Sequence, residues 1–135
     1  MTFAELASHA PAWYLYASTK IWPAQGPAGR PRSWNQCEPT TNMVVSKIYG
    51  LGEWPEPVRA FGRLALPQQY PQLDGHFWGE SEVVDRGEPV IVDLSIGQTG
   101  WPEQWVMGTQ AELAAKGLYY ASYMRTPYMN LTYAL

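Results

Sequence analysis

The stretch Pro89-Val90-Ile91-Val92-Asp93-Leu94 decides the fold class of this chain. Its run of β-branched residues, opened by a proline, is typical of a buried strand. The preceding Arg86-Gly87-Glu88 predicts a hairpin turn, and residues 76–84 alternate in the manner of a second strand. Residues 58–66 alternate more loosely and predict a third strand. We therefore expect about three antiparallel strands in the middle of the chain.

The N-terminal residues predict helix. Thr2 followed by Glu5 matches a capping box, in which each side chain bonds the other's backbone N–H. Pro11 marks a place where such a helix ends or restarts. The segment Trp13-Tyr14-Leu15-Tyr16 fits a helix or a strand equally well.

Further helices are predicted on either side of the strands. Residues 23–33 are a loop dense in Pro and Gly, and residues 39–51 place apolar side chains at helical spacing. A loop over 95–110 precedes a predicted helix over 110–124, and the tail over 127–135 predicts an apolar strand or a docked segment. Helices and strands segregated along the chain predict an α+β architecture.

Composition limits the classes of protein to consider. The 135 residues are 46% hydrophobic and 16% charged, with a net charge of −3, so we expect a single folded domain that does not bind nucleic acid. One cysteine excludes a disulfide framework, and two histidines leave few metal ligands, so we expect neither metal nor cofactor. The N-terminal residues lack a signal-peptide pattern and no apolar run approaches the ~20 residues of a membrane span, so we expect a cytoplasmic protein without membrane contact.

The lone cysteine, Cys37, stands just before the predicted helix over 39–51. A helix N-terminus offers free N–H groups and positive potential, which favour the thiolate over the thiol. The same N–H groups can stabilise an oxyanion on an acyl group that the thiolate attacks. Cys37 is therefore a candidate nucleophile.

His76, Asp93 and Glu80 are the candidate partners of that thiol. Asp93 is flanked by apolar residues, so we expect its carboxylate to be partly buried and to need a polar partner. His76 opens the neighbouring strand, and Glu80 on that strand is a second acid for it. Pairing through the predicted turn sets Asp93 opposite Gly79 or Glu80, so a bulge or a register shift is needed to bring it beside His76.

Three segments carry a resemblance to a known family: Asn35-Gln36-Cys37-Glu38-Pro39-Thr40-Thr41, His76-Phe77-Trp78-Gly79-Glu80 and Val90-Ile91-Val92-Asp93-Leu94-Ser95. In their order and spacing they resemble the transglutaminase-like branch of the papain-like cysteine enzymes. The resemblance covers about residues 34–98, between an N-terminal part (1–33) and a C-terminal part (99–135). It implies a papain/transglutaminase-like core, with the cysteine at a helix N-terminus packed on a small antiparallel sheet.

The resemblance also implies roles for residues. It makes Cys37, His76 and Asp93 a catalytic triad and points to Gln36 or Trp34, upstream of the cysteine, as the second oxyanion donor. Independently of the resemblance, Trp78 lies next to His76 on the same face of the predicted strand, where it would shield an acyl-enzyme from water. The chain departs from the family in having Asn35 where a Gly is usual, and Glu38-Pro39 where small residues follow the cysteine.

The predicted function is that of a cysteine hydrolase or acyltransferase acting on an amide or thioester carbonyl: a protease, a glutamine deamidase or a transglutaminase-type enzyme. Its expected partner is a protein or peptide substrate. Two alternatives stay open. Trp54, Trp101 and Trp105 would line a non-catalytic protein-binding surface, or the C-terminal tyrosines would mediate self-association in a small assembly factor of a phage or mobile element.

Overall fold

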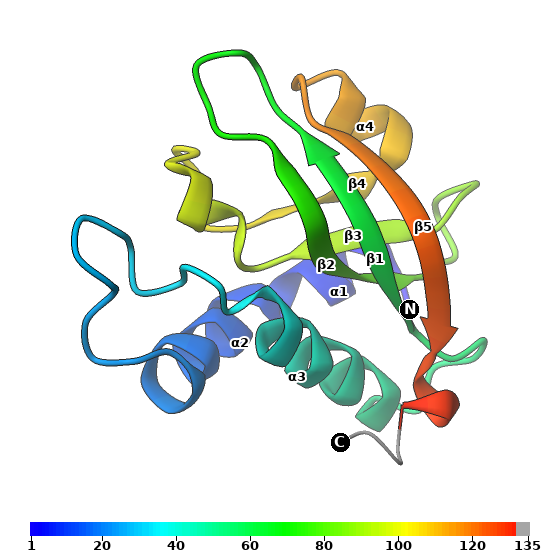
Figure 1. The fold of residues 1–135 in the computed structure, drawn as a ribbon. Coiled ribbons are helices and arrows are strands. Elements are labelled where there is room, and N and C mark those ends of the chain that lie inside the picture. Colours follow the sequence, from blue (N-terminus) through cyan, green and yellow to red (C-terminus); the bar gives the residue numbers. More distant parts are fainter. Residues whose placement is uncertain (132–135) are drawn as a thin grey trace.

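A five-stranded antiparallel sheet forms the frame of the protein, and the computed structural model describes residues 1–131 (Figure 1). The strand order is β4-β3-β2-β1-β5. The strands are β1 (Val58–Ala65), β2 (Leu73–Ser81), β3 (Val90–Asp93), β4 (Val106–Thr109) and β5 (Tyr119–Pro127). The helices are α1 (Phe3–Ser8), α2 (Ala10–Tyr16), a π-helical turn η1 (Ala17–Ile21), α3 (Cys37–Gly50), the 3₁₀ turns η2 (Ile96–Thr99) and η3 (Tyr128–Asn130), and α4 (Gln110–Ala114).

The three N-terminal helices cover one face of the sheet (Figure 1). Buried residues of α1, α2 and α3 pack there against β3 and its flanks: Leu6, Trp13, Val44, Ile48, Val83, Val90, Val92 and Leu94. Gly79 of β2 lets α3 approach, because a Cβ there would already touch the Val44 and Val45 side chains at 3.4 Å. The helix that begins at Cys37 is therefore seated directly on β2.

A second core fills the opposite, concave face of the sheet, where α4 packs against β4 and β5 (Figure 1). It comprises Ala60, Leu64, Leu66, Trp78, Ile91, Ile96, Val106, Leu113, Leu118 and Tyr120. Side chains alternate between faces along a strand, so β3 sends Val90 and Val92 to the helices and Ile91 and Asp93 to this second core.

The α+β expectation is confirmed, and the N-terminal predictions are largely correct. Thr2 caps α1 by accepting from the Glu5 N–H at 3.1 Å, and Pro11 lies in the first turn of the restarted helix α2. The ambiguous segment 13–16 is helical. Helix α3 begins two residues earlier than predicted, at Cys37, with Pro39 still inside its first turn.

Two predictions for the C-terminal part were wrong. The loop predicted over 95–110 contains η2 and strand β4, and the helix predicted over 110–124 ends at Ala114, after which β5 begins at Tyr119. Gly117 has φ +90° and ends the helical turn, and the following Tyr119-Tyr120 favours a strand. Five strands form where three were expected. Of the predicted tail, 132–135 lie outside the described residues.

The register of β2 and β3 also differs from the prediction. The pairs are Gly79 with Val92, Glu80 with Ile91 and Ser81 with Val90. Continued by one residue, this register places Asp93 beside Trp78, not Gly79 or Glu80. A shift of one residue changes the face on which a side chain lies. Asp93 therefore shares a face with His76, two residues from Trp78 along β2.

Two irregularities in the ladders meet beside His76. Gly62 of β1 pairs with His76, and the ladder to β2 shifts next to it, with Gly75 at φ +85° as the extra residue. The predicted Asp74-Gly75 turn is thus a bulge inside β2. The ladder to β5 shifts between Phe61 and Gly62. Bulges bend a strand and redirect its side chains, and this pair lies where β2 presents its histidine.

We predict that Gly62→Ala lowers the free energy of unfolding by about 1–3 kcal/mol, the usual cost of overpacking. A Cβ at this position would lie 2.1 Å from the Ala121 carbonyl oxygen and 2.7 Å from the Ser122 Cα, both backbone atoms that cannot rotate away. Urea denaturation measures the change. Gly87→Ala is the matched control, because a Cβ there meets nothing within 4 Å. Equal stability of the two variants would contradict the close packing of β1 and β5.

Candidate active site

His76 and Asp93 form an ion pair inside the protein. The His76 Nε2 lies 2.7 Å from the Asp93 Oδ2, and each side chain is only 1% exposed. The Tyr120 hydroxyl donates to the same Oδ2 at 2.7 Å, and Ser95 donates to Oδ1 through its backbone N–H at 3.0 Å and its hydroxyl at 3.2 Å. Both carboxylate oxygens are therefore hydrogen-bonded, as a buried carboxylate requires.

The pair favours the charged forms of both groups. Burial is the largest influence on His76 and opposes its charge, but Asp93 and then the Cys37 thiol outweigh it and raise the pKa of His76 to about 9. Burial likewise opposes the charge on Asp93, but His76 and the hydrogen bonds from Tyr120 and Ser95 hold the pKa of Asp93 below its usual range. Burial and the neighbouring Asp93 raise the pKa of Tyr120, which keeps its phenol protonated as a donor.

Cys37 completes the group. It is the first residue of α3, half-buried, and its thiol lies close enough to the His76 ring to raise the pKa of the imidazole. Because Asp93 occupies Nε2, Nδ1 is the ring nitrogen that the ion pair leaves without a partner from Asp93. His76 lies on β2 three residues before the first residue that pairs with β3, and the thiol of Cys37, at the N-terminus of α3, interacts with its ring. The three residues predicted as a triad are thus brought together.

The backbone before Cys37 takes a special conformation. Asn35 has φ +61°, the left-handed region that glycine favours and asparagine tolerates better than most residues. Asn35 thus adopts a backbone conformation that is typical of glycine, the residue usual at this position in the family that the sequence resembles. The bend at Asn35 is followed directly by Gln36, the N-cap, and by the first turn of α3.

The structure does not bring the other predicted residues to the thiol in the expected way. The Arg30 guanidinium lies over the Trp34 ring, 4.1 Å from the centroid of that ring. Gln36 is half-buried as the N-cap, but its side chain makes no capping bond. Trp78 is 1% exposed and donates to Glu80 at 2.9 Å, so it is part of the core and has no surface with which to shield a substrate.

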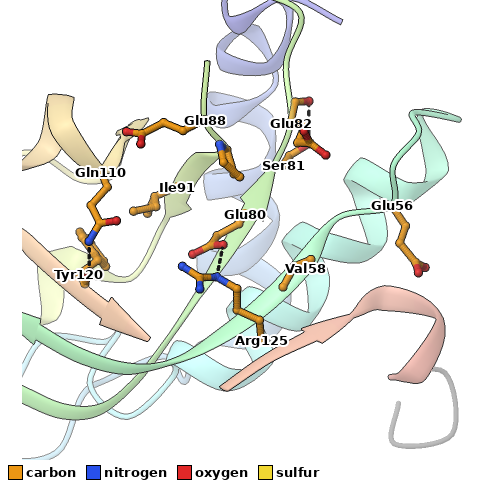
Figure 2. A pocket seen from close by; sticks show the side chains of 11 residues that line it. Glu56, Val58, Glu80, Ser81, Glu82, Glu88, Ile91, Gln110, Tyr120 and Arg125 are labelled. Atoms are coloured by element: carbon orange, nitrogen blue, oxygen red, sulfur yellow. Dashed lines mark hydrogen bonds and ion pairs between the residues drawn. The ribbon is translucent and has the colours of Figure 1, made fainter. Parts of the chain in front are cut away.

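Glu80 belongs to a different cluster from the one predicted. Its Oε1 accepts from the Arg125 Nε at 2.8 Å, as Figure 2 shows. Both residues line a cavity of about 260 Å³. Other acids that line this cavity bond backbone N–H groups: Glu56 accepts from Met129 and Glu88 from Ala111. Three acids of this cavity, Glu56, Glu80 and Glu88, therefore have partners within the fold, and Glu80 is not the partner of His76.

One polar residue at this site was missed by the sequence analysis. Gln98 in η2 is 6% exposed, and its Oε1 accepts from the Asn35 backbone N–H at 3.3 Å. Its Nε2 is the one buried side-chain nitrogen or oxygen without a hydrogen-bond partner among residues 1–131. A glutamine in a predicted loop carries no periodic signal, and only its contact with the segment before Cys37 makes it notable.

Comparisons with known proteins add no assignment: no family model, curated protein or solved structure matches this chain. Within the described part of the chain, no three His, Cys, Asp or Glu side chains are grouped so as to hold a metal ion. No helix there is both long and apolar enough to span a bilayer.

The ion pair predicts how stability depends on pH. The folded protein holds the His76 proton with a pKa of about 9, above the ~6.5 of an unfolded histidine, so the pair's contribution is complete below about pH 6.5 and is lost as the pH rises through 9. The difference between the folded and unfolded pKa values of His76 corresponds to about 3 kcal/mol in the free energy of unfolding. The lowered pKa of Asp93 means that its contribution is present above about pH 4 and is lost on further acidification.

We therefore expect the free energy of unfolding of the wild type to fall between pH 6.5 and 10, and that of Asp93→Asn to lack this fall. Without the carboxylate, burial favours the neutral ring, so this variant gains relative stability as the pH rises. Urea titrations across this range measure both profiles. Asp74→Asn, which removes an exposed acid of β2, is the control and should follow the wild type. Parallel profiles for wild type and Asp93→Asn would contradict a charged pair.

Proposed function

We propose that this protein is a cysteine-dependent acyl-transfer enzyme that attacks an amide or thioester carbonyl through Cys37, His76 and Asp93. The observation that carries the proposal is the buried His76–Asp93 pair at 2.7 Å with the half-buried Cys37 thiol against the ring. A buried charged pair is costly to maintain for stability alone. A thiol beside an imidazolium at a helix N-terminus is the environment that activates a cysteine.

The first half-reaction forms a thioester. The Cys37 thiolate attacks the carbonyl carbon, and the electron pair of the C=O bond moves to oxygen. The N–H groups of the first turn of α3 face the resulting oxyanion. When the intermediate collapses, the bond to the leaving amine or thiol breaks, and the leaving group takes the proton held by His76. Asp93 keeps the ring oriented and stabilises its charge.

The second half-reaction removes the acyl group. Water, or an amine in a transferase, loses a proton to His76 as it attacks the thioester carbon. The C–S bond breaks, and the thiolate and the imidazolium are restored. Water as acceptor makes the enzyme a protease or a glutamine deamidase, and an amine makes it a transglutaminase-type enzyme.

The arrangement is also the basis for proposing a papain/transglutaminase-like core. A cysteine at the start of a helix, a histidine on a strand and an acid on the next strand occur here in that chain order. Helix α3 lies across β2, as that core requires. Support for this proposal comes from the geometry of the site and from the resemblance of the three sequence segments.

The Trp-rich binding surface finds less support. Trp54 is 80% exposed, but Trp101 and Trp105 are half-buried and pack against the two cores. Among the C-terminal tyrosines, Tyr119 and Tyr123 are exposed, whereas Tyr120 is bonded to Asp93. Tyr133 lies outside the described residues. No observation favours either alternative over acyl transfer.

The test of the proposed function uses a small thioester, the benzyl thioester of an N-acylglycine, with release of the thiol followed by colour. We expect Cys37→Ala to abolish turnover. We expect Asp93→Asn to lower kcat/KM by about 10²-fold or more, the usual contribution of acid–base groups. Circular dichroism and thermal unfolding establish that each variant is folded.

Glu80→Gln is the matched control, because it also converts a buried acid to its amide and keeps an oxygen for the Trp78 N–H. Its kcat/KM should stay within a few-fold of the wild type. Turnover by Cys37→Ala at the wild-type rate would refute the nucleophile. A larger loss in Glu80→Gln than in Asp93→Asn would move the orienting role to Glu80.

A further inference from the structure

Gln98 presents a buried hydrogen-bond donor that the fold does not use. Its side chain is 6% exposed and its Nε2 has no partner among residues 1–131, whereas its Oε1 is bonded. Buried polar groups are nearly always paired, and those that are not often mark a place where something else binds. The missing partner of Gln98 is a hydrogen-bond acceptor.

The location of that donor connects it to the thiol. The Gln98 Oε1 accepts from the N–H of Asn35, two residues before Cys37, and this bond secures the segment that bends at φ +61°. The nitrogen and oxygen of an amide are attached to the same carbon, so Nε2 lies against the same segment. It is thus placed beside the residues that lead into α3.

A cavity of about 500 Å³ runs past this position. Ser33, shortly before Asn35, and Gly97, directly before Gln98, both line it. The two segments that meet at the Gln98–Asn35 bond therefore also form walls of an open space large enough for part of a substrate. Gly97 directly precedes Gln98 and Ser33 lies four residues before Cys37, so the cavity borders the two segments that carry the donor and the thiol.

We infer that the Gln98 amide is the second oxyanion donor: its Nε2 binds the carbonyl oxygen of the amide or thioester that Cys37 attacks. This inference rests on the proposed function and adds a residue to it. The first donor is the backbone N–H of Cys37. Gln98 takes the role that the sequence resemblance assigned to Gln36 or Trp34, and it comes from downstream of Asp93 instead of upstream of the cysteine.

The experiment compares two reactions of the same thiol. Acetylation by p-nitrophenyl acetate forms a C–S bond, passes through a tetrahedral oxyanion and expels p-nitrophenolate with the electron pair of its C–O bond. Alkylation by iodoacetamide displaces iodide from a saturated carbon and forms no oxyanion. Peptide mass spectrometry measures both rates at Cys37, the single cysteine. An oxyanion donor affects the first reaction alone.

Two variants remove the donor in different ways. Gln98→Glu keeps an oxygen for the Asn35 N–H, and Gln98→Met keeps the length of the side chain without a charge. We expect both to slow acetylation by about 10²–10³-fold, the usual effect of losing one such donor. Alkylation should stay within about threefold. Gln104→Leu, an exposed glutamine beside the same cavity, is the control and should change neither rate.

The other outcomes are distinct. Equal slowing of acetylation and alkylation would make Gln98 a positioning residue for Cys37 and overturn its role as a donor. Acetylation at the wild-type rate in both Gln98 variants would also overturn the donor role. Slow reaction of wild-type Cys37 with both reagents, unaffected by His76→Gln, would refute the proposed function itself and this inference with it. Thermal unfolding of each variant confirms that the rates belong to folded protein.

Discussion

The ion pair between His76 and Asp93 is the interaction on which the rest of the structure depends. Two charges at 1% exposure are tolerated only where hydrogen bonds replace water. Tyr120 from the edge strand β5 and Ser95, two residues after β3, supply those bonds, so segments far apart in the sequence converge on one carboxylate. The concave core closes around the pair, and the Cys37 thiol interacts with the same imidazole ring.

The placement of the pair follows from small adjustments of the sheet. A register one residue away from the simplest hairpin puts Asp93 on the face of His76, and bulges beside Gly62 shape β2 where it carries the ring. The segment that follows β3 then supplies Gln98 to the loop before Cys37. A short stretch from Asp93 to Gln98 thus both orients the histidine and secures the approach to the thiol.

The sequence predicts those parts of the site that local chemistry dictates. A cysteine before a helix, and an acid within an apolar strand that must find a partner, are visible without a structure, and so is the capped start of α1. The register of β2 and β3 is not, because it depends on how Gly75 and Gly62 are accommodated by neighbouring strands. Strand β5 is missed because the Ala-rich residues that precede it favour a helix as far as Gly117. Gln98 is missed because its importance depends on one long-range hydrogen bond, to the Asn35 N–H.

The central claim is that Cys37 and His76 act as a thiolate–imidazolium pair, and the alkylation rate of Cys37 at pH 6.5 tests it most directly. The thiolate is the reactive form, and the only cysteine makes intact mass an unambiguous measure. The account predicts that wild-type protein reacts with iodoacetamide at least about tenfold faster than folded His76→Gln, with Asp93→Asn also slowed. Equal rates in wild type and both variants would identify Cys37 as a structural thiol and contradict the account.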